Sequence, residues 1–134
     1  MSVVITNGRN LLSYLFEGTG YSLPATYYIG LATASPTSAG LFTNEVAVGS
    51  YARVAVPNNS ANWTVSGTLS QAINDNAVTF VESTASWGTI TYVFIADSLT
   101  GGTMLYYGAL STTRAVPIAT TVYFPAGGLT LQVA

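Results

Sequence analysis

The sequence WGTITYVFIADSLTGGTMLYYGAL, residues 87–110, consists of two apolar runs joined by a polar turn that contains a Gly-Gly pair. Glycine readily adopts the positive φ angles of tight turns, so we predict a β-hairpin with strands at 88–96 and 103–110. Asp97 is the only charged residue in this stretch. A hairpin so poor in charge must be covered by other parts of a folded or assembled protein.

Strict alternation along the two hairpin strands places apolar side chains on both faces of the hairpin. Ile90, Tyr92 and Phe94 fall on one face of the first strand, and Val93 and Ile95 fall on the other. A strand with two apolar faces is typical of the middle of a covered sheet. We expect a second sheet to cover one face and a neighbouring subunit to cover the other. A helix or loop of the same chain is the alternative cover, and residues 34–49 are the candidate.

Short β-type runs, separated by Pro, Gly, Asn and Ser, continue on both sides of the hairpin. We predict further strands near 25–33, 50–56, 61–65, 77–81, 119–124 and 128–133. This spacing is typical of a β-sandwich or barrel, and about eight strands indicate two packed sheets. The sequence therefore predicts an all-β fold, a two-sheet β-sandwich over residues 25–133.

One short helix is predicted before the first strand, around residues 8–17. Thr6 or Asn7 is a candidate N-cap, four apolar residues follow at helical spacing, and Gly18 and Gly20 are stop signals. We expect this helix to plug one end of the core. With 134 residues and 13.9 kDa, the chain suits a single domain over residues 1–134.

Charged residues make up only 6% of the chain, whereas a typical soluble domain has about 25%. This deficit favours a protein that is covered or assembled in use, although a surface rich in Ser, Thr and Asn is an alternative explanation. A net charge of −2 without clustered basic residues argues against nucleic acid. No apolar run is long enough to span a bilayer, and the first ten residues lack the pattern of a signal peptide.

His, Cys and Lys are absent, which removes the commonest general base, thiol nucleophile and metal ligands. The five carboxylates show no paired spacing, so we predict no catalytic, cofactor-binding or metal-binding residues, and no enzyme. A two-carboxylate glycosidase is the one enzyme class that these residues could support. The aromatic residues could also form a sugar-stacking surface, but a core and a protein interface explain them better.

Residues 34–49 form a predicted long loop that carries the apolar residues Leu41 and Phe42. Such side chains either fold under the loop or protrude as an anchor for another protein. We name Leu41, Phe42, Glu45, Tyr51 and Arg53 as candidate protein-interface residues. Arg53 either pairs with a carboxylate of a neighbour or neutralises Glu45 within the chain.

Several segments resemble small tailed-phage virion proteins. The resemblance covers residues 26–133 and rests on the segments YIGLAT, NEV followed by GSYARV, FIADSLTGGTMLYYGAL and FPAGGLTLQV. Members of this family are labelled tail-fibre or minor capsid proteins, and some are similar to capsid cement (decoration) proteins with a jelly-roll sandwich. The segment STAS before Trp87 departs mildly from the family pattern.

The resemblance implies a structural virion protein that is made in the host cytoplasm without a signal peptide. Our first expectation is a cement protein on the capsid exterior, which clamps neighbouring copies of the major capsid protein and forms a homodimer or homotrimer. The alternative is a tail-fibre or tail-tip component that contacts host glycan. No cofactor, nucleic acid or membrane is expected in either role. The copy number per particle separates the two roles.

Overall fold

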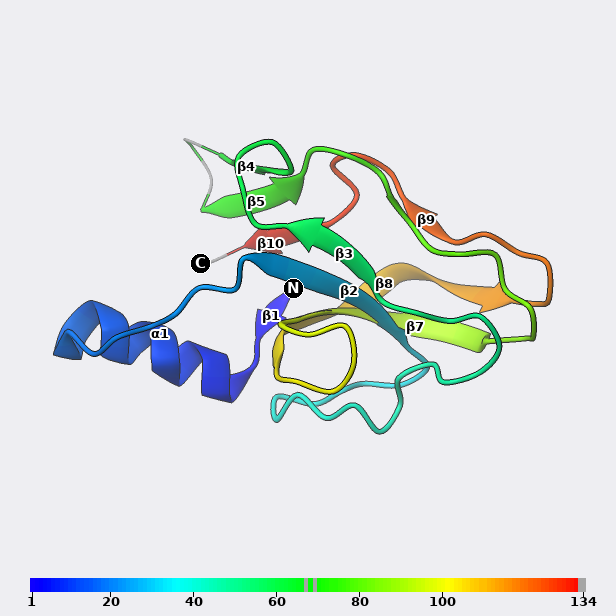
Figure 1. Ribbon diagram of the computed structural model, residues 1–134, viewed down its shortest axis with the longest axis horizontal. Helices are drawn as coiled ribbons and strands as arrows, with labels where there is room; N and C mark the ends of the chain where they lie inside the picture. The colour runs from blue at the N-terminus through cyan, green and yellow to red at the C-terminus, as the bar shows by residue number, and fades with distance from the viewer. Residues whose placement is uncertain (67, 69, 133–134) are drawn as a thin grey trace.

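A computed structural model describes residues 1–66, 68 and 70–132. The elements in chain order are β1 (Ser2–Val3), α1 (Ile5–Glu17), β2 (Thr26–Ala32), β3 (Val54–Pro57), β4 (Trp63–Val65), β5 (Gln71–Asn74), β6 (Val78–Thr79), β7 (Gly88–Ala96), β8 (Met104–Val116), β9 (Tyr123–Phe124) and β10 (Thr130–Gln132). The predicted all-β sandwich with one N-terminal helix is confirmed (Figure 1).

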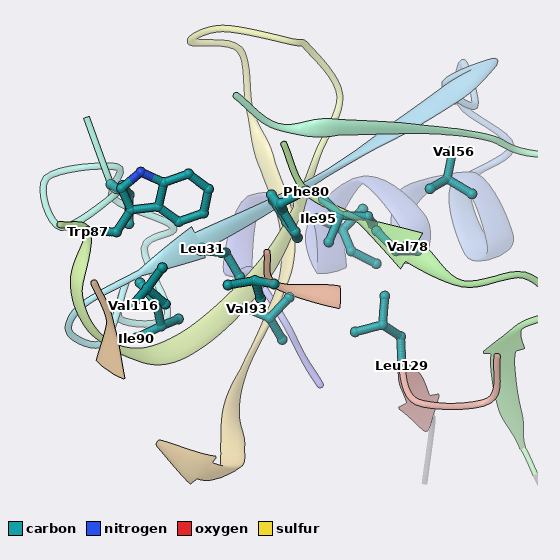
Figure 2. Packing of buried hydrophobic residues seen from close by; sticks show 13 residues of the cluster. Leu31, Val56, Val78, Phe80, Trp87, Ile90, Val93, Ile95, Val116 and Leu129 are labelled. Carbon is teal, nitrogen blue, oxygen red and sulfur yellow. The ribbon is translucent and has the colours of Figure 1, made fainter. Parts of the chain in front are cut away.

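The larger layer is an antiparallel sheet with the strand order β1-β8-β7-β2-β3. Two smaller sheets, β10-β5-β4 and β6-β9, form the other layer. The main core lies between the layers, where Leu31 and Val93 of the large sheet approach Phe80 and Leu129 (Figure 2). Burial of these apolar side chains is the principal stabilising contribution to the sandwich.

The predicted strand positions differ from the structure in several places. β8 continues to Val116, six residues beyond the expected end, while β3 begins only at Val54. β1 and β5 were not predicted, because two and four residues are too short to show a clear alternation. The last residue of the predicted strand 128–133 lies outside the described residues.

The predicted division of the hairpin into two faces is wrong at two positions, because the β7–β8 pairing contains register shifts. Ile90 joins Val93 and Ile95 in the main core instead of Tyr92 and Phe94. The same alternation predicts Met104 on one face with Tyr106 and Leu110, which pack against the main core, but Met104 lies with Phe94 on the opposite face. A β-bulge adds residues to one strand and so breaks the two-residue period on which the prediction relied.

The outer face of the large sheet is partly covered by this chain's own loop and N-terminus. The ring of Phe42 packs edge-on against Phe94 at 5.5 Å, and Val4 is buried in the same cluster. Phe94 in turn lies over Gly30, where an added Cβ would approach the ring to 2.1 Å. The alternative cover, the loop 34–49, is therefore present, whereas we had expected a neighbouring subunit there.

The helix α1 does not plug the core as expected. Asn7 is its only buried residue, and Figure 1 shows α1 extending past the edge of the sandwich. The predicted N-cap is also wrong, because the helix begins one turn earlier with Val4 as N-cap and no side-chain cap. Asn7 instead donates to the Leu105 carbonyl at 3.4 Å and accepts from the Tyr21 hydroxyl at 2.6 Å. These bonds connect α1 to β8 and to the segment that follows α1.

Candidate protein interface

Four of the five candidate interface residues meet in one cluster, which we call the Arg53 cluster: Phe42, Glu45, Tyr51 and Arg53. An isolated bridge between Ala32 and Glu45 holds Glu45 beside the end of β2, and Arg53 directly precedes β3. The Arg53 Nε and Nη2 atoms donate to the two Glu45 carboxylate oxygens, each at 2.8 Å. This bidentate geometry is the strongest that a guanidinium and a carboxylate can form.

Arg53 also fixes the turn of the β7–β8 hairpin. Its Nη1 atom donates to the carbonyl oxygens of Ser98 at 2.7 Å and Gly101 at 2.9 Å. The guanidinium carbon lies 4.5 Å from the centre of the Phe42 ring, within cation–π range. One buried side chain therefore joins the long loop, the start of β3 and the hairpin turn.

Tyr51 completes the Arg53 cluster from the core side. Its hydroxyl donates to Glu45 Oε1 at 3.1 Å and accepts from the Leu31 backbone N–H at 3.0 Å. Burial, followed by the nearby Glu45 carboxylate, raises the pKa of Tyr51 well above its usual value. The hydroxyl therefore stays protonated and acts as a fixed hydrogen-bonding group.

The placement of these residues decides between the two alternatives for Arg53. Arg53 neutralises Glu45 within the chain, and its side chain is only 2% exposed. Leu41 is the one candidate that points outward, with 53% of its surface exposed. Of the five candidates, Leu41 is thus the residue best placed to contact another protein directly, while the Arg53 cluster holds its loop in position.

A larger exposed apolar surface lies on α1, on a face that we call the apolar helix face: Leu12, Leu15 and Phe16. These residues are three and four positions apart and so lie on the same side of the helix. Leu15 is 67% exposed and Phe16 is 82% exposed. The sequence predicts this stripe, but we expected it to lie in the core. The sequence carries no signal against the core here, because an apolar stripe on one side of a helix is also what a core-facing helix shows.

The described residues offer little for chemistry. Among them, no three His, Cys, Asp or Glu side chains gather closely enough to hold a metal ion. No described helix has the length and apolarity that crossing a lipid bilayer requires. The notable features are therefore packed loops and exposed apolar side chains, which are features of protein–protein contact.

Comparison with known proteins identifies a family. A family model described as the podophage GP4 fiber I protein gp80 matches residues 3–132, nearly the whole chain. The matched region includes α1, the Arg53 cluster and both layers of the sandwich. A search of curated proteins finds no match.

Proposed function

Since the chain belongs to the podophage GP4 fiber I protein gp80 family and is a structural protein of a tailed-phage virion, we propose that it is a subunit of a fibre. In this role the β-sandwich is a rigid body, and α1 attaches it to a neighbouring virion protein. The observation that carries the proposal is the apolar helix face, which extends beyond the sandwich in a chain with only 6% charged residues.

The energetics favour attachment through α1. Full burial of one Leu or Phe side chain is worth about 1.5–3 kcal/mol, so the apolar helix face offers several kcal/mol to a partner. The fold of the isolated chain buries these side chains only in part, because Leu12, Leu15 and Phe16 each keep more than half of their surface exposed. A short apolar helix surface at one end of a rigid body is suited to docking in a hydrophobic groove of another protein.

A fibre subunit needs no reactive group. We therefore propose that the chain is not an enzyme and that it acts without a cofactor, a nucleic acid or a membrane. The partners in this proposal are another virion protein and a second copy of the chain. The absence of His, Cys and Lys from the sequence supports the proposal.

The test is incorporation of α1 variants into phage particles. Leu15→Glu and Phe16→Glu place a charge in the proposed contact and are expected to lower incorporation at least tenfold. Ile118→Glu is the matched control, because Ile118 is 64% exposed in a turn outside α1. Circular dichroism and thermal unfolding of each purified variant check that the sandwich is intact. Normal incorporation of both helix variants would contradict attachment through α1.

Capsid cement is the second candidate function, with the major capsid protein as partner and the capsid exterior as location. The supporting observation is Leu41, which the Arg53 cluster holds outward on a fixed loop. If the chain is cement, Leu41→Asp abolishes binding to purified shells and leaves the fold intact. A fibre subunit attached through α1 tolerates this substitution.

A further inference from the structure

A groove of about 480 Å³ opens between β8 of the large sheet and the second layer. Residues 108–112 and Arg114 line it on the side of β8, and residues 122–125 and 128–130 line it on the side of β9 and β10. Its volume falls within the range of about 300–1,000 Å³ that is usual for small-molecule sites. No residue of α1 lines the groove, so it is separate from the apolar helix face.

Met1 occupies the part of the groove beside Gly108. An added Cβ at Gly108 would approach Met1 Cγ to 3.0 Å, and the Met1 backbone nitrogen donates to the Thr130 carbonyl oxygen at 3.2 Å. The bulge of β8 and the side chain of Arg114 line the groove further along the strand. A ligand therefore has to be matched to that part of the lining.

The wall of the groove on β8 is a large β-bulge. Ile90 faces Arg114 and Tyr92 faces Ala109, so residues 110–113 have no partner residue on β7. No described strand pairs with these four residues on the other side of β8 either. Their backbone groups therefore have no ladder partner in the described structure and can bond to a ligand. Bulges are frequent next to active sites, where they redirect a side chain.

Arg114 is the side chain that follows this bulge. Residues that oppose each other in an antiparallel pair share a face of the sheet. Arg114 opposes Ile90, which is buried in the main core, and Val116, two positions further on, lies in the same core. The Arg114 side chain therefore projects from the inner face of the sheet. Because Arg114 is exposed and lines the groove, its guanidinium is available to a ligand there.

The charge of Arg114 is unmatched. No described carboxylate or other described group bonds to its guanidinium, and no Asp or Glu lines the groove. A guanidinium binds a carboxylate through two parallel hydrogen bonds, as Arg53 does with Glu45. One arginine balances one carboxylate, whereas a phosphate monoester carries about −1.5 to −2 charges at pH 7. The groove is therefore suited to a ligand that carries a carboxylate.

The rest of the lining is suited to a sugar ring. Tyr123 is exposed and lines the groove, and an exposed aromatic ring can stack on the apolar face of a pyranose. Ser111, Thr112 and Thr130 supply hydroxyl groups for hydrogen bonds to the sugar hydroxyls. A peptide strand fits less well, because the bulge interrupts the regular ladder that strand addition needs.

We propose that this groove binds an acidic sugar, a pyranose that carries a carboxylate. Arg114 pairs with the carboxylate, Tyr123 stacks on the ring, and the bulge and the hydroxyl side chains bond to the ring hydroxyls. The site goes beyond the proposed fibre role and does not depend on it, because attachment through α1 uses other residues. In a fibre subunit, this site gives the virion a contact with acidic polysaccharide.

The test is titration calorimetry of the full chain with disaccharides of galacturonate, glucuronate and mannuronate, each compared with its neutral parent sugar. At least one acidic disaccharide should bind, and its neutral counterpart should bind about tenfold more weakly or less, because the charged hydrogen bonds are lost. Arg114→Met should weaken binding of the acidic sugar by about tenfold or more for the same reason. Tyr123→Ala should weaken binding of the acidic and the neutral sugar alike. Arg9→Met removes the same charge from an exposed position on α1 and is the matched control.

The site is overturned if no acidic disaccharide binds, if acidic and neutral sugars bind equally, or if Arg114→Met binds as tightly as the wild type. Displacement of the sugar by an equal concentration of acetate or inorganic phosphate would show a simple anion site instead. Tighter binding of a Glu-containing tetrapeptide would overturn the sugar assignment in favour of an acidic peptide. If Arg114→Met fails to fold, NMR of the wild type with the acidic disaccharide decides, and unshifted amides at residues 110–114 overturn the site. None of these results bears on virion attachment, which the incorporation of the α1 variants tests.

Discussion

Arg53 and Glu45 form a bidentate ion pair with both nitrogen–oxygen distances at 2.8 Å, and the Arg53 side chain is almost fully buried. The pair connects the long loop to the hairpin turn through the Ser98 and Gly101 carbonyl oxygens. In a chain with three basic residues, one is thus used entirely inside the fold. These contacts fix the loop that carries Leu41 to the rest of the fold.

Replacement of Arg53 is expected to destabilise the fold strongly. Arg53→Met leaves the Glu45 carboxylate without its partner and two carbonyl oxygens without donors, at a cost of about 3 kcal/mol in the free energy of unfolding. Urea unfolding measures the loss. Arg114→Met is the control, because Arg114 is exposed, and its cost should stay below about 0.5 kcal/mol. Equal losses for the two variants would mean that the buried pair has no special role.

Alkaline pH is expected to lower the stability through buried tyrosines. Burial, followed by the neighbouring Tyr106, raises the pKa of Tyr27 to about 12, whereas an unfolded tyrosine has a pKa of about 10. The folded chain therefore holds the proton more tightly, and the stabilisation is complete below pH 10 and lost as the pH rises towards 12. Between pH 9 and pH 11, ionisation of Tyr27 should lower the free energy of unfolding by less than about 1 kcal/mol, because solvent screens part of the interaction at this partly buried side chain.

Tyr27→Phe is the control for this pH dependence. The variant keeps the ring that packs against Trp63 at 6.0 Å and removes the titrating hydroxyl. Urea unfolding at pH 9 and pH 11 should show a smaller loss for this variant than for the wild type. An identical loss would assign the alkaline destabilisation to other groups, such as Tyr51, whose pKa is also raised by burial.

Gly30→Ala is expected to destabilise the outer face of the large sheet. The added Cβ would lie 2.1 Å from Phe94 Cζ, so the ring must move out of its packed position, at a cost of about 2–3 kcal/mol. Thermal unfolding measures the change, and a second substitution, Phe94→Leu, should recover part of it. Gly20→Ala has open space around the added Cβ and should leave the midpoint of unfolding nearly unchanged. A Gly30→Ala protein as stable as the wild type would show that Phe94 does not need this glycine.

Leu41 and Phe42 are adjacent in sequence, but substitution should lower the free energy of unfolding much more at Phe42 than at Leu41. Phe42→Ala removes a ring that contacts both Phe94 and Arg53 and should cost about 2 kcal/mol or more. Leu41→Asp changes an exposed side chain and should cost less than about 0.5 kcal/mol. Urea unfolding of both variants tests the difference. A large loss for Leu41→Asp would place this side chain in the packed structure and remove it as an anchor.

The sequence predicted the fold class, because alternation, turn residues and strand spacing are local signals. Gly88–Ala96 was predicted as a strand at the correct boundaries. The sequence could not predict on which face of the sheet Ile90 lies. The register shift between Ile90 and Tyr92 changes the face, and this shift depends on the pairing of β7 with β8. The extension of β8 through Ser111 and Arg114 was missed because the run of polar residues there shows no apolar alternation and is typical of a loop.

The candidate interface was predicted only in part, because sequence shows which residues are apolar but not which neighbour covers them. Glu45 and Arg53 were named as a potential internal pair, and the structure forms that pair. Phe42 was also named, but only the fold could show that it lies under the loop against Phe94. Conversely, Phe16 was assigned to the core, and its exposure depends on how far α1 extends past the sandwich.

The most direct test of the proposed function is the number of copies of this chain in a purified particle, by quantitative mass spectrometry against the major capsid protein. A fibre subunit should be present in a small number of copies, far below that of the shell protein. A ratio near one to one, or a simple fraction of it, would contradict the fibre role and establish the cement role. Absence of the chain from particles would contradict both.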